Sequence, residues 1–210
     1  NNIGVKGTSA LAAILKETQI SELDLGYNQL CGLDYDGNGT YTAEGITKLC
    51  EGLKGSAVTS LSLRDNRLGP EGGLALTKGL KGNITLQKLD IGYNRIGDEG
   101  ASALAAILKE TMISNLNLEY NKLGPEGGAA IAEGLKGNST LQSLNVCDND
   151  IMGDAASHLA KVVLDHAAMT EFCGIPLASL RENSITELNL RWRGVGVPGA
   201  IVLSKLLPSA

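Results

Sequence analysis

A short pattern of apolar residues around one asparagine recurs along the chain and limits the folds that it can adopt. The copies of L-x-x-L-x-L-x-x-N-x-L are ISELDLGYNQL (20–30), VTSLSLRDNRL (58–68), LQKLDIGYNRI (86–96), ISNLNLEYNKL (113–123) and LQSLNVCDNDI (141–151). A sixth copy, ITELNLRWRGV (185–195), keeps the apolar positions but has Arg193 in place of the asparagine. One such unit cannot bury its own apolar face, so the pattern predicts units that stack on one another.

The spacing of the copies gives the length of one repeat. The asparagines stand at positions 1, 28, 66, 94, 121 and 149, in steps of 27, 38, 28, 27 and 28 residues. The step of 38, and the later step of 44 from position 149 to 193, predict insertions near 31–41 and 165–184. Because NNIGVKGTSALAAILKET (1–18) matches NRIGDEGASALAAILKET (94–111), we expect a single domain over 1–210 that begins in mid-repeat.

The fold class follows from the pattern within one unit. In SNLNL (114–118) leucines alternate with polar residues, which is typical of a strand with one buried face. The next segment, GPEGGAAIAEGLKGN (124–138), has Pro125 and Glu126 where a helix would start, small apolar residues inside it and glycine near its end. Strand and helix alternate, so the predicted class is α/β, a solenoid with a parallel concave sheet and convex helices.

These repeats resemble the ribonuclease-inhibitor-like leucine-rich repeats, a class also found in Ran GTPase-activating protein and in NOD-like sensor domains. The resemblance covers nearly the whole chain, and it implies a horseshoe in which an asparagine such as Asn121 turns inward to bond backbone groups of the adjacent turn. Two segments, GTYTAEGI (39–46) and EFCGIPLASLRENSITELNL (171–190), are similar to phrases found in leucine-rich-repeat proteins of unicellular eukaryotes.

The first insertion contains DYDGNGTYTAEG (34–45), which begins like a calcium-binding loop. The oxygen ligands of a weak site there would be Asp34, Asp36, Asn38 and the carbonyl group of Thr40. Glu44, however, aligns with the helix-start glutamates of the other repeats, and position twelve, where an EF-hand requires its bidentate glutamate, is Gly45. A solvent-exposed turn uses the same residue types, and we favour that interpretation over calcium.

The second insertion has two interpretations. If Met169 lies opposite Leu141 and Phe172 opposite Leu144, MTEFCG (169–174) forms a further strand. The 44 residues from position 149 to 193 then contain one whole repeat and one truncated repeat without its helix. The alternative is a simple surface loop.

Side chains that point out from the concave sheet face are the candidate binding residues. The residue before each asparagine forms one column: Tyr27, Asp65, Tyr93, Tyr120, Asp148 and Trp192. The residue before that forms another: Gly26, Arg64, Gly92, Glu119, Cys147 and Arg191. Exposed Tyr, Trp and Arg dominate protein–protein hot spots. The predicted partner-binding residues are therefore Tyr27, Arg64, Asp65, Tyr93, Glu119, Tyr120, Asp148, Arg191 and Trp192; alternatively, the tyrosines only pack over neighbouring backbone.

A third, polar column is Asp24, Ser62, Asp90, Asn117, Asn145 and Asn189. It either receives a basic partner or is simply solvated, and solvation is the safer assumption.

Composition narrows the function classes. The net charge of -5 argues against nucleic-acid binding, and the sequence has no apolar run that suits membrane insertion. Four widely separated cysteines favour reduced thiols and a cellular or organellar interior over secretion. No nucleophile with a base, metal-ligand cluster or phosphate loop is evident, so we expect neither catalysis nor a cofactor.

The predicted function is therefore a non-catalytic interaction or scaffold module that binds another protein through its concave face or open ends, as a free protein or within a larger assembly. The alternative is the repeat domain of a regulatory protein, such as a GTPase activator or NOD-like sensor.

Overall fold

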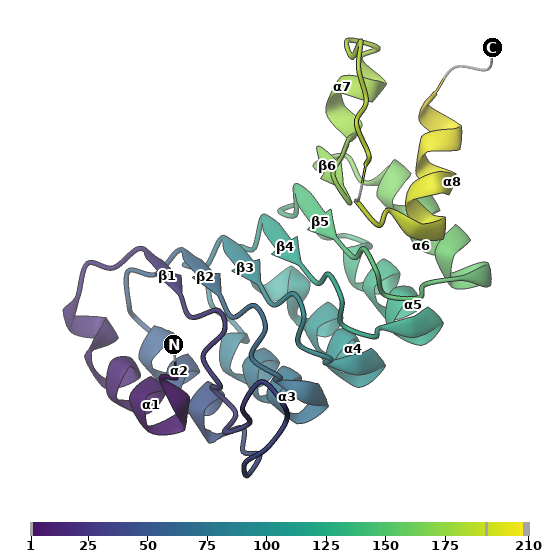
Figure 1. Cartoon of the computed structure of the whole chain (residues 1–210). Helices are drawn as coiled ribbons and strands as arrows, with labels where there is room; N and C mark the ends of the chain where they lie inside the picture. The colour runs from purple at the N-terminus through teal and green to yellow at the C-terminus, as the bar shows by residue number, and fades with distance from the viewer. Residues whose placement is uncertain (1, 192, 208–210) are drawn as a thin grey trace.

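The computed structural model describes residues 2–191 and 193–207, and Figure 1 shows one curved sheet backed by a row of helices. The strands follow one another in chain order across the sheet: β1 (Glu22–Asp24), β2 (Ser60–Ser62), β3 (Lys88–Asp90), β4 (Asn115–Asn117), β5 (Ser143–Asn145), β6 (Glu171–Phe172) and β7 (Ile175–Pro176). The first six run parallel, as predicted, and β7 runs antiparallel to β6.

The register of the sheet follows the repeat. The central leucines of neighbouring strands are paired, as in Leu61 with Leu89 and Leu89 with Leu116. These leucines are almost fully buried, whereas the residues on either side of them are partly or fully exposed. A slip of one residue would turn the buried leucines to solvent, so the alternation fixes the register.

The helices lie on the convex side, as predicted (Figure 1). They are α1 (Gly4–Ile14), α2 (Glu44–Leu53), α3 (Gly69–Leu80), α4 (Gly97–Ile107), α5 (Gly124–Leu135), α6 (Gly153–Asp165) and α8 (Gly196–Leu206), with 3-10 turns η1 (Leu15–Glu17) and η2 (Leu108–Glu110) after α1 and α4. The short helix α7 (Leu177–Arg181) lies beside β6 at the end of the sheet. Proline near the start of α3 and α5 matches the fixed backbone angle of a first helical turn. Glu44 opens α2, where its charge suits the helix dipole.

Close packing of the helices depends on glycine. A Cβ atom on Gly134 of α5 would lie 2.6 Å from the carbonyl oxygen and 2.8 Å from the Cα atom of Ala105 in α4. Gly52 of α2 lies against Ala12 of α1 in the same way. Neighbouring helices therefore approach to a distance that no larger residue permits at these positions.

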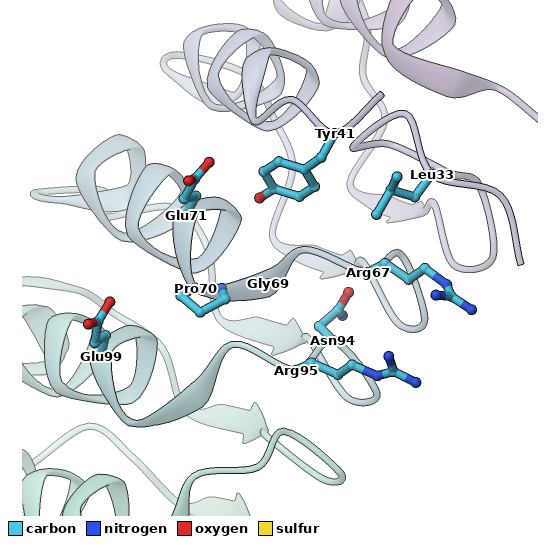
Figure 2. Close-up of a pocket in the computed structure, with 9 residues that line it drawn as sticks. All are labelled: Leu33, Tyr41, Arg67, Gly69, Pro70, Glu71, Asn94, Arg95 and Glu99. Atoms are coloured by element: carbon cyan, nitrogen blue, oxygen red, sulfur yellow. The ribbon is translucent and has the colours of Figure 1, made fainter. Parts of the chain in front are cut away.

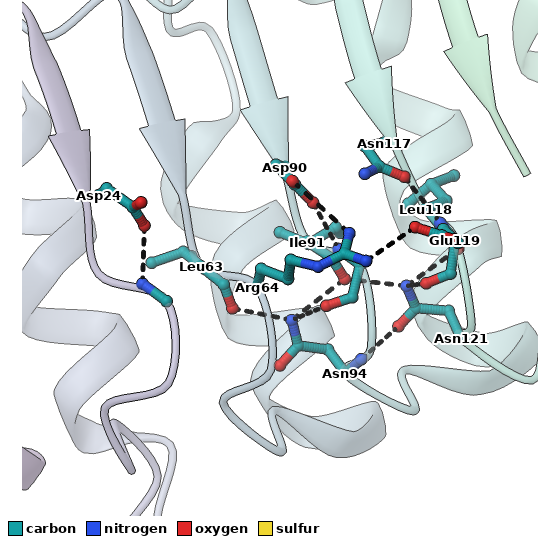
Figure 3. Close-up of polar contacts among 12 residues, drawn as sticks. Asp24, Leu63, Arg64, Asp90, Ile91, Asn94, Asn117, Leu118, Glu119 and Asn121 are labelled. Atoms are coloured by element: carbon teal, nitrogen blue, oxygen red, sulfur yellow. Dashed lines mark hydrogen bonds and ion pairs between the residues drawn. The ribbon is translucent and has the colours of Figure 1, made fainter. Parts of the chain in front are cut away.

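The repeat asparagines join one repeat to the next in the loops that follow the strands. The side-chain oxygen of Asn94 accepts hydrogen bonds from the backbone N–H groups of Asn66 (2.9 Å) and Leu68 (3.2 Å) in the preceding repeat. Its amide group donates to the carbonyl oxygens of Leu63, Ile91 and Gly92, at 2.9 to 3.0 Å. Asn121 repeats this arrangement one step along, so its predicted inward position is confirmed (Figure 3).

The second insertion confirms one prediction and corrects another. Phe172 pairs with Leu144 in β6, as the predicted register required. The chain then reverses at Cys173 and Gly174, both with positive φ, and β7 pairs antiparallel with β6 before the five-residue helix α7. The predicted truncated repeat without a helix is therefore wrong, and so is the simple surface loop.

The sixth copy also departs from the prediction, because residues 185–190 form no strand. The edge of β6 that a further parallel strand would use is already paired with β7. Arg181 of α7 holds this hairpin in place by donating hydrogen bonds to the carbonyl oxygens of Met169 (2.6 Å) and Leu164 (3.1 Å) near the end of α6.

Candidate functional site

The two predicted columns of binding residues lie where the strands end and the loops toward the helices begin. Tyr27, Asp65, Tyr93, Tyr120 and Asp148 all have φ between +53° and +59°. This left-handed conformation disfavours side chains with a Cβ atom. The asparagine after each of these residues is held by several hydrogen bonds. These bonds keep the turn in its left-handed conformation and so fix the direction of the side chains before the asparagines.

An ion pair crosses the centre of this surface. Arg64, after β2, extends over the repeat of β3 and places Nη2 2.9 Å from Oε2 of Glu119, after β4, while Nη1 lies 3.8 Å from Oδ2 of Asp90 (Figure 3). Gly92 leaves room for this path, because a Cβ atom there would lie 2.8 Å from Nη1 of Arg64. Desolvation acts to lower the pKa of Arg64, but Glu119 and Asp90 outweigh it and raise that pKa.

Aromatic rings extend the same group. The guanidinium carbon of Arg64 lies 4.3 Å from the ring centre of Tyr93, and the ring of Tyr93 stacks on Tyr120 at 4.5 Å with an angle of 21°. Burial, and next the charge of Glu119, raise the pKa of Tyr93. We call Arg64, Tyr93, Glu119 and Tyr120 the concave cluster; each member is held by at least one other.

The remaining predicted residues lie at different distances from the concave cluster. Tyr27, 59% exposed, is a hydrogen-bonding neighbour of Arg64, and Tyr120 is 49% exposed at the other side. Asp65 and Asp148 continue the column on their own loops. Arg191 is exposed and follows residues 185–190, which form no strand, so it does not stand at a strand end as predicted. Trp192 lies outside the described residues.

The third, polar column has a structural use that the sequence analysis missed. The side-chain oxygens of Asp24, Asp90, Asn117, Asn145 and Asn189 each accept a hydrogen bond from the backbone N–H group two residues later, at 2.8 to 3.0 Å. The recurrence of Asp and Asn at this position was the available signal, because both residues favour such turns.

In the 34–45 loop, the carboxylate of Asp34 accepts hydrogen bonds from inside the loop. Its Oδ1 atom accepts from the backbone N–H groups of Asp36 (3.0 Å) and Asn38 (2.8 Å), and Oδ2 accepts from the Asn38 amide (3.2 Å). These bonds, first those from Asn38, lower the pKa of Asp34. The geometry is that of a hydrogen-bonded turn, and calcium binding by Asp34, Asp36, Asn38 and Thr40 stays a prediction.

A cavity of about 510 Å³ lies between this loop and the starts of α3 and α4 (Figure 2). Tyr41, Leu33 and Pro70 form its apolar walls, and Figure 2 shows Arg67 and Arg95 together at one rim. Arg67 also donates a hydrogen bond to the carbonyl of Tyr35, which fastens the loop to the next repeat. No sequence pattern marks this cavity, because it exists only where the insertion folds against two later repeats.

All four cysteines are buried and free. Burial raises the pKa of Cys31 to about 11 and that of Cys50 to about 12, so neither thiol readily forms the reactive thiolate. Within residues 2–191 and 193–207, no three His, Cys, Asp or Glu side chains are grouped as metal ligands. No helix in that part of the chain combines the length and apolar character needed to span a bilayer.

Comparison with known proteins agrees with this architecture. A family model described as Leucine Rich repeat matches residues 57–76, 82–105, 111–132 and 137–160. The mouse (Mus musculus) protein "NACHT, LRR and PYD domains-containing protein 12" is 29% identical over 218 aligned residues, which cover 96% of this chain. The chain spans only 20% of that relative's length.

Two solved structures are similar in fold. "Leiomodin-1 Actin-Binding Site 2 (ABS2)" has a TM-score of 0.56 at 19% identity and covers 77% of this chain and 90% of its own. The tropomodulin C-terminal domain of Caenorhabditis elegans has a TM-score of 0.56 at 13% identity and covers 74% of this chain and 90% of its own. The repeated strand, buried asparagine and helix, with these matches, make the chain a leucine-rich-repeat protein.

Proposed function

We propose that the chain is a non-catalytic protein-interaction module and that its concave face binds a partner protein. The observation that carries the proposal is the concave cluster. Its Arg and Tyr side chains are the types that dominate protein interfaces, and their mutual contacts hold them in place before any partner arrives. The predicted binding residues Tyr27, Asp65 and Asp148 extend the surface on either side.

The comparisons support an interaction role at the level of the repeat. Leiomodin-1 is named for an actin-binding site, and the relative of 29% identity carries an LRR region within a much longer protein. That second similarity favours one further candidate function, in which this chain is the repeat domain of a larger regulatory protein of the NOD-like sensor kind. Membership of a larger assembly is also a proposal, beside that of a sensor-type repeat domain.

The test begins with native size fractionation of the protein from its source and mass spectrometry of the proteins that comigrate with it. The partner found is then titrated against the wild-type chain and against Tyr120→Ala. We expect Tyr120→Ala to weaken binding about tenfold or more, which is typical of an interface hot spot.

A matched control is Ile84→Ala, which removes a 74% exposed apolar side chain from the turn between α3 and β3, at the other end of the strands. It should bind like the wild type. No loss in Tyr120→Ala, or a loss only in Ile84→Ala, would place the interface away from the concave face.

A further inference from the structure

A second cavity, of about 350 Å³, lies at the end of the column that contains Tyr93 and Tyr120. It opens between the loop after β5 and the start of α8, and we call it the end pocket. Its walls are largely apolar, with Val146, Ile151, Val195 and Pro198 among them, and the exposed residues Asp148 and Asp150 also line it.

The end pocket exists because the stack of repeats is interrupted there. In three successive regular repeats the glycine that starts a helix donates its N–H group to the asparagine carbonyl of the next repeat, for example Gly97 to Asn121 and Gly124 to Asn149, at 3.0 and 2.9 Å. Gly153 starts α6 without such a bond among the described residues. The β6–β7 hairpin turns back instead of supplying the next loop, so residues 194–198 face the loop after β5 in its place. Gly194 lies against the carboxylate of Asp148, and the end pocket is the space that remains beside them.

Among the described residues, no cation forms an ion pair with the carboxylates of Asp148 and Asp150, and neither carboxylate accepts a side-chain hydrogen bond there. Burial raises the pKa of Asp148, and the negative charges of Glu119 and Asp150 raise it further. In the middle of the surface, by contrast, Arg64 neutralises the charge of Glu119.

We propose that the partner bound by the concave face presents a lysine or arginine side chain that enters the end pocket. Such a side chain has an aliphatic stem that suits apolar walls and a cationic head that suits two neighbouring carboxylates. An apolar side chain would bury the walls but would leave Asp148 and Asp150 partly desolvated and unpaired. This inference rests on the proposed function, because the pocket continues the same column of loop residues.

The test uses the 210-residue chain and does not require the natural partner. Short random peptides displayed on phage are selected on the chain, and the enriched sequences are synthesised and measured by fluorescence anisotropy. We expect enriched peptides to share a lysine or arginine, and replacement of that residue by the uncharged norleucine to weaken binding about tenfold or more. The affinity should also fall between about 0.05 M and about 0.5 M salt.

The matching protein variants carry the same change of charge at two places. Asp148→Asn/Asp150→Asn should reproduce the loss, since Asn also tolerates the left-handed backbone at both positions (φ +54°). The control Asp36→Asn/Asp98→Asn removes two exposed carboxylates elsewhere and should leave binding unchanged.

The outcomes separate the two proposals. Suppose that Tyr120→Ala weakens peptide binding, but that the peptides share no basic residue or bind Asp148→Asn/Asp150→Asn as well as the wild type. This result would contradict a basic side chain in the end pocket and would still support binding at the concave face. Peptides unaffected by either variant, or a selection that enriches none, would contradict both.

Discussion

The guanidinium group of Arg64 lies 2.9 Å from the carboxylate of Glu119, although the whole repeat of β3 stands between them. This contact is possible because the intervening residue is Gly92. Arg64 also lies over the ring of Tyr93, which stacks on Tyr120. Three consecutive repeats are therefore tied together on the surface that we propose binds a partner.

The strength of this contact can be measured with a double-mutant cycle. Arg64→Gln, Glu119→Gln and the double variant should give a coupling energy of about 0.5–1 kcal/mol in urea unfolding, because both side chains are still 22 to 27% exposed. The coupling should shrink at high salt. A value near zero at low salt would mean that the ion pair does not hold the concave cluster.

Asn94→Ala should destabilise the protein by about 2–4 kcal/mol, because it removes five hydrogen bonds and leaves backbone groups of two repeats buried without partners. Urea or thermal unfolding measures the loss. The control Asn115→Ala changes an exposed strand position and should cost no more than about 0.5 kcal/mol. Similar losses in both variants would contradict the structural role of the buried asparagines.

Gly134→Ala should destabilise the protein even though alanine is the better helix former by about 1 kcal/mol. The new Cβ atom would meet backbone atoms of Ala105 at 2.6 to 2.8 Å, and the shift of α5 away from α4 should cost about 1–3 kcal/mol net. Ser102→Ala, on the exposed side of α4, is the control and should be close to neutral. A gain in stability for Gly134→Ala would show that the helices are not closely packed.

His166 should make stability depend on pH. Its side chain is 7% exposed, and neither ring nitrogen has a hydrogen-bond partner among the described residues. Burial lowers the pKa of His166 below 6.5. The charge of Arg181 acts in the same direction, and the backbone of Asn138 partly opposes it. Between the unfolded value of 6.5 and the lowered folded value, the unfolded chain binds more protons. The contribution of neutral His166 to the free energy of unfolding is therefore fully present above pH 6.5, and it falls as the pH drops through that window.

Urea unfolding of the wild type and of His166→Gln across this pH range measures the effect. The difference in unfolding free energy between the two should fall below pH 6.5 and level off under the folded pKa. An NMR titration of the ring protons should give a midpoint below 6.5. A midpoint above 6.5, or a stability difference independent of pH, would contradict the burial of an unpaired neutral imidazole.

The repeat itself was predictable because its buried positions recur. Leucines at strand spacing gave the sheet and its register, and the register of Phe172 with Leu144 followed from the same spacing. The inward position of Asn121 came from the resemblance to a known repeat class, and the hydrogen bonds of the structure confirm it. These features depend on local pattern, which each copy carries in full.

Features that join distant repeats were not predictable in the same way. The strand expected at 185–190 is missing because the turn at Cys173 and Gly174 lets β7 take its edge of the sheet first. The Arg64–Glu119 pair depends on side chains of two repeats and on a glycine in a third, so no single copy of the pattern contains it.

The most direct test of the interface is photo-crosslinking of the protein in extracts of its source. A photoreactive amino acid replaces Tyr120 on the concave face in one variant and Ser102 on the convex helix α4 in another. The proposed function predicts one discrete crosslinked protein from position 120 and none from position 102. A crosslink from position 102 alone would contradict binding at the concave face.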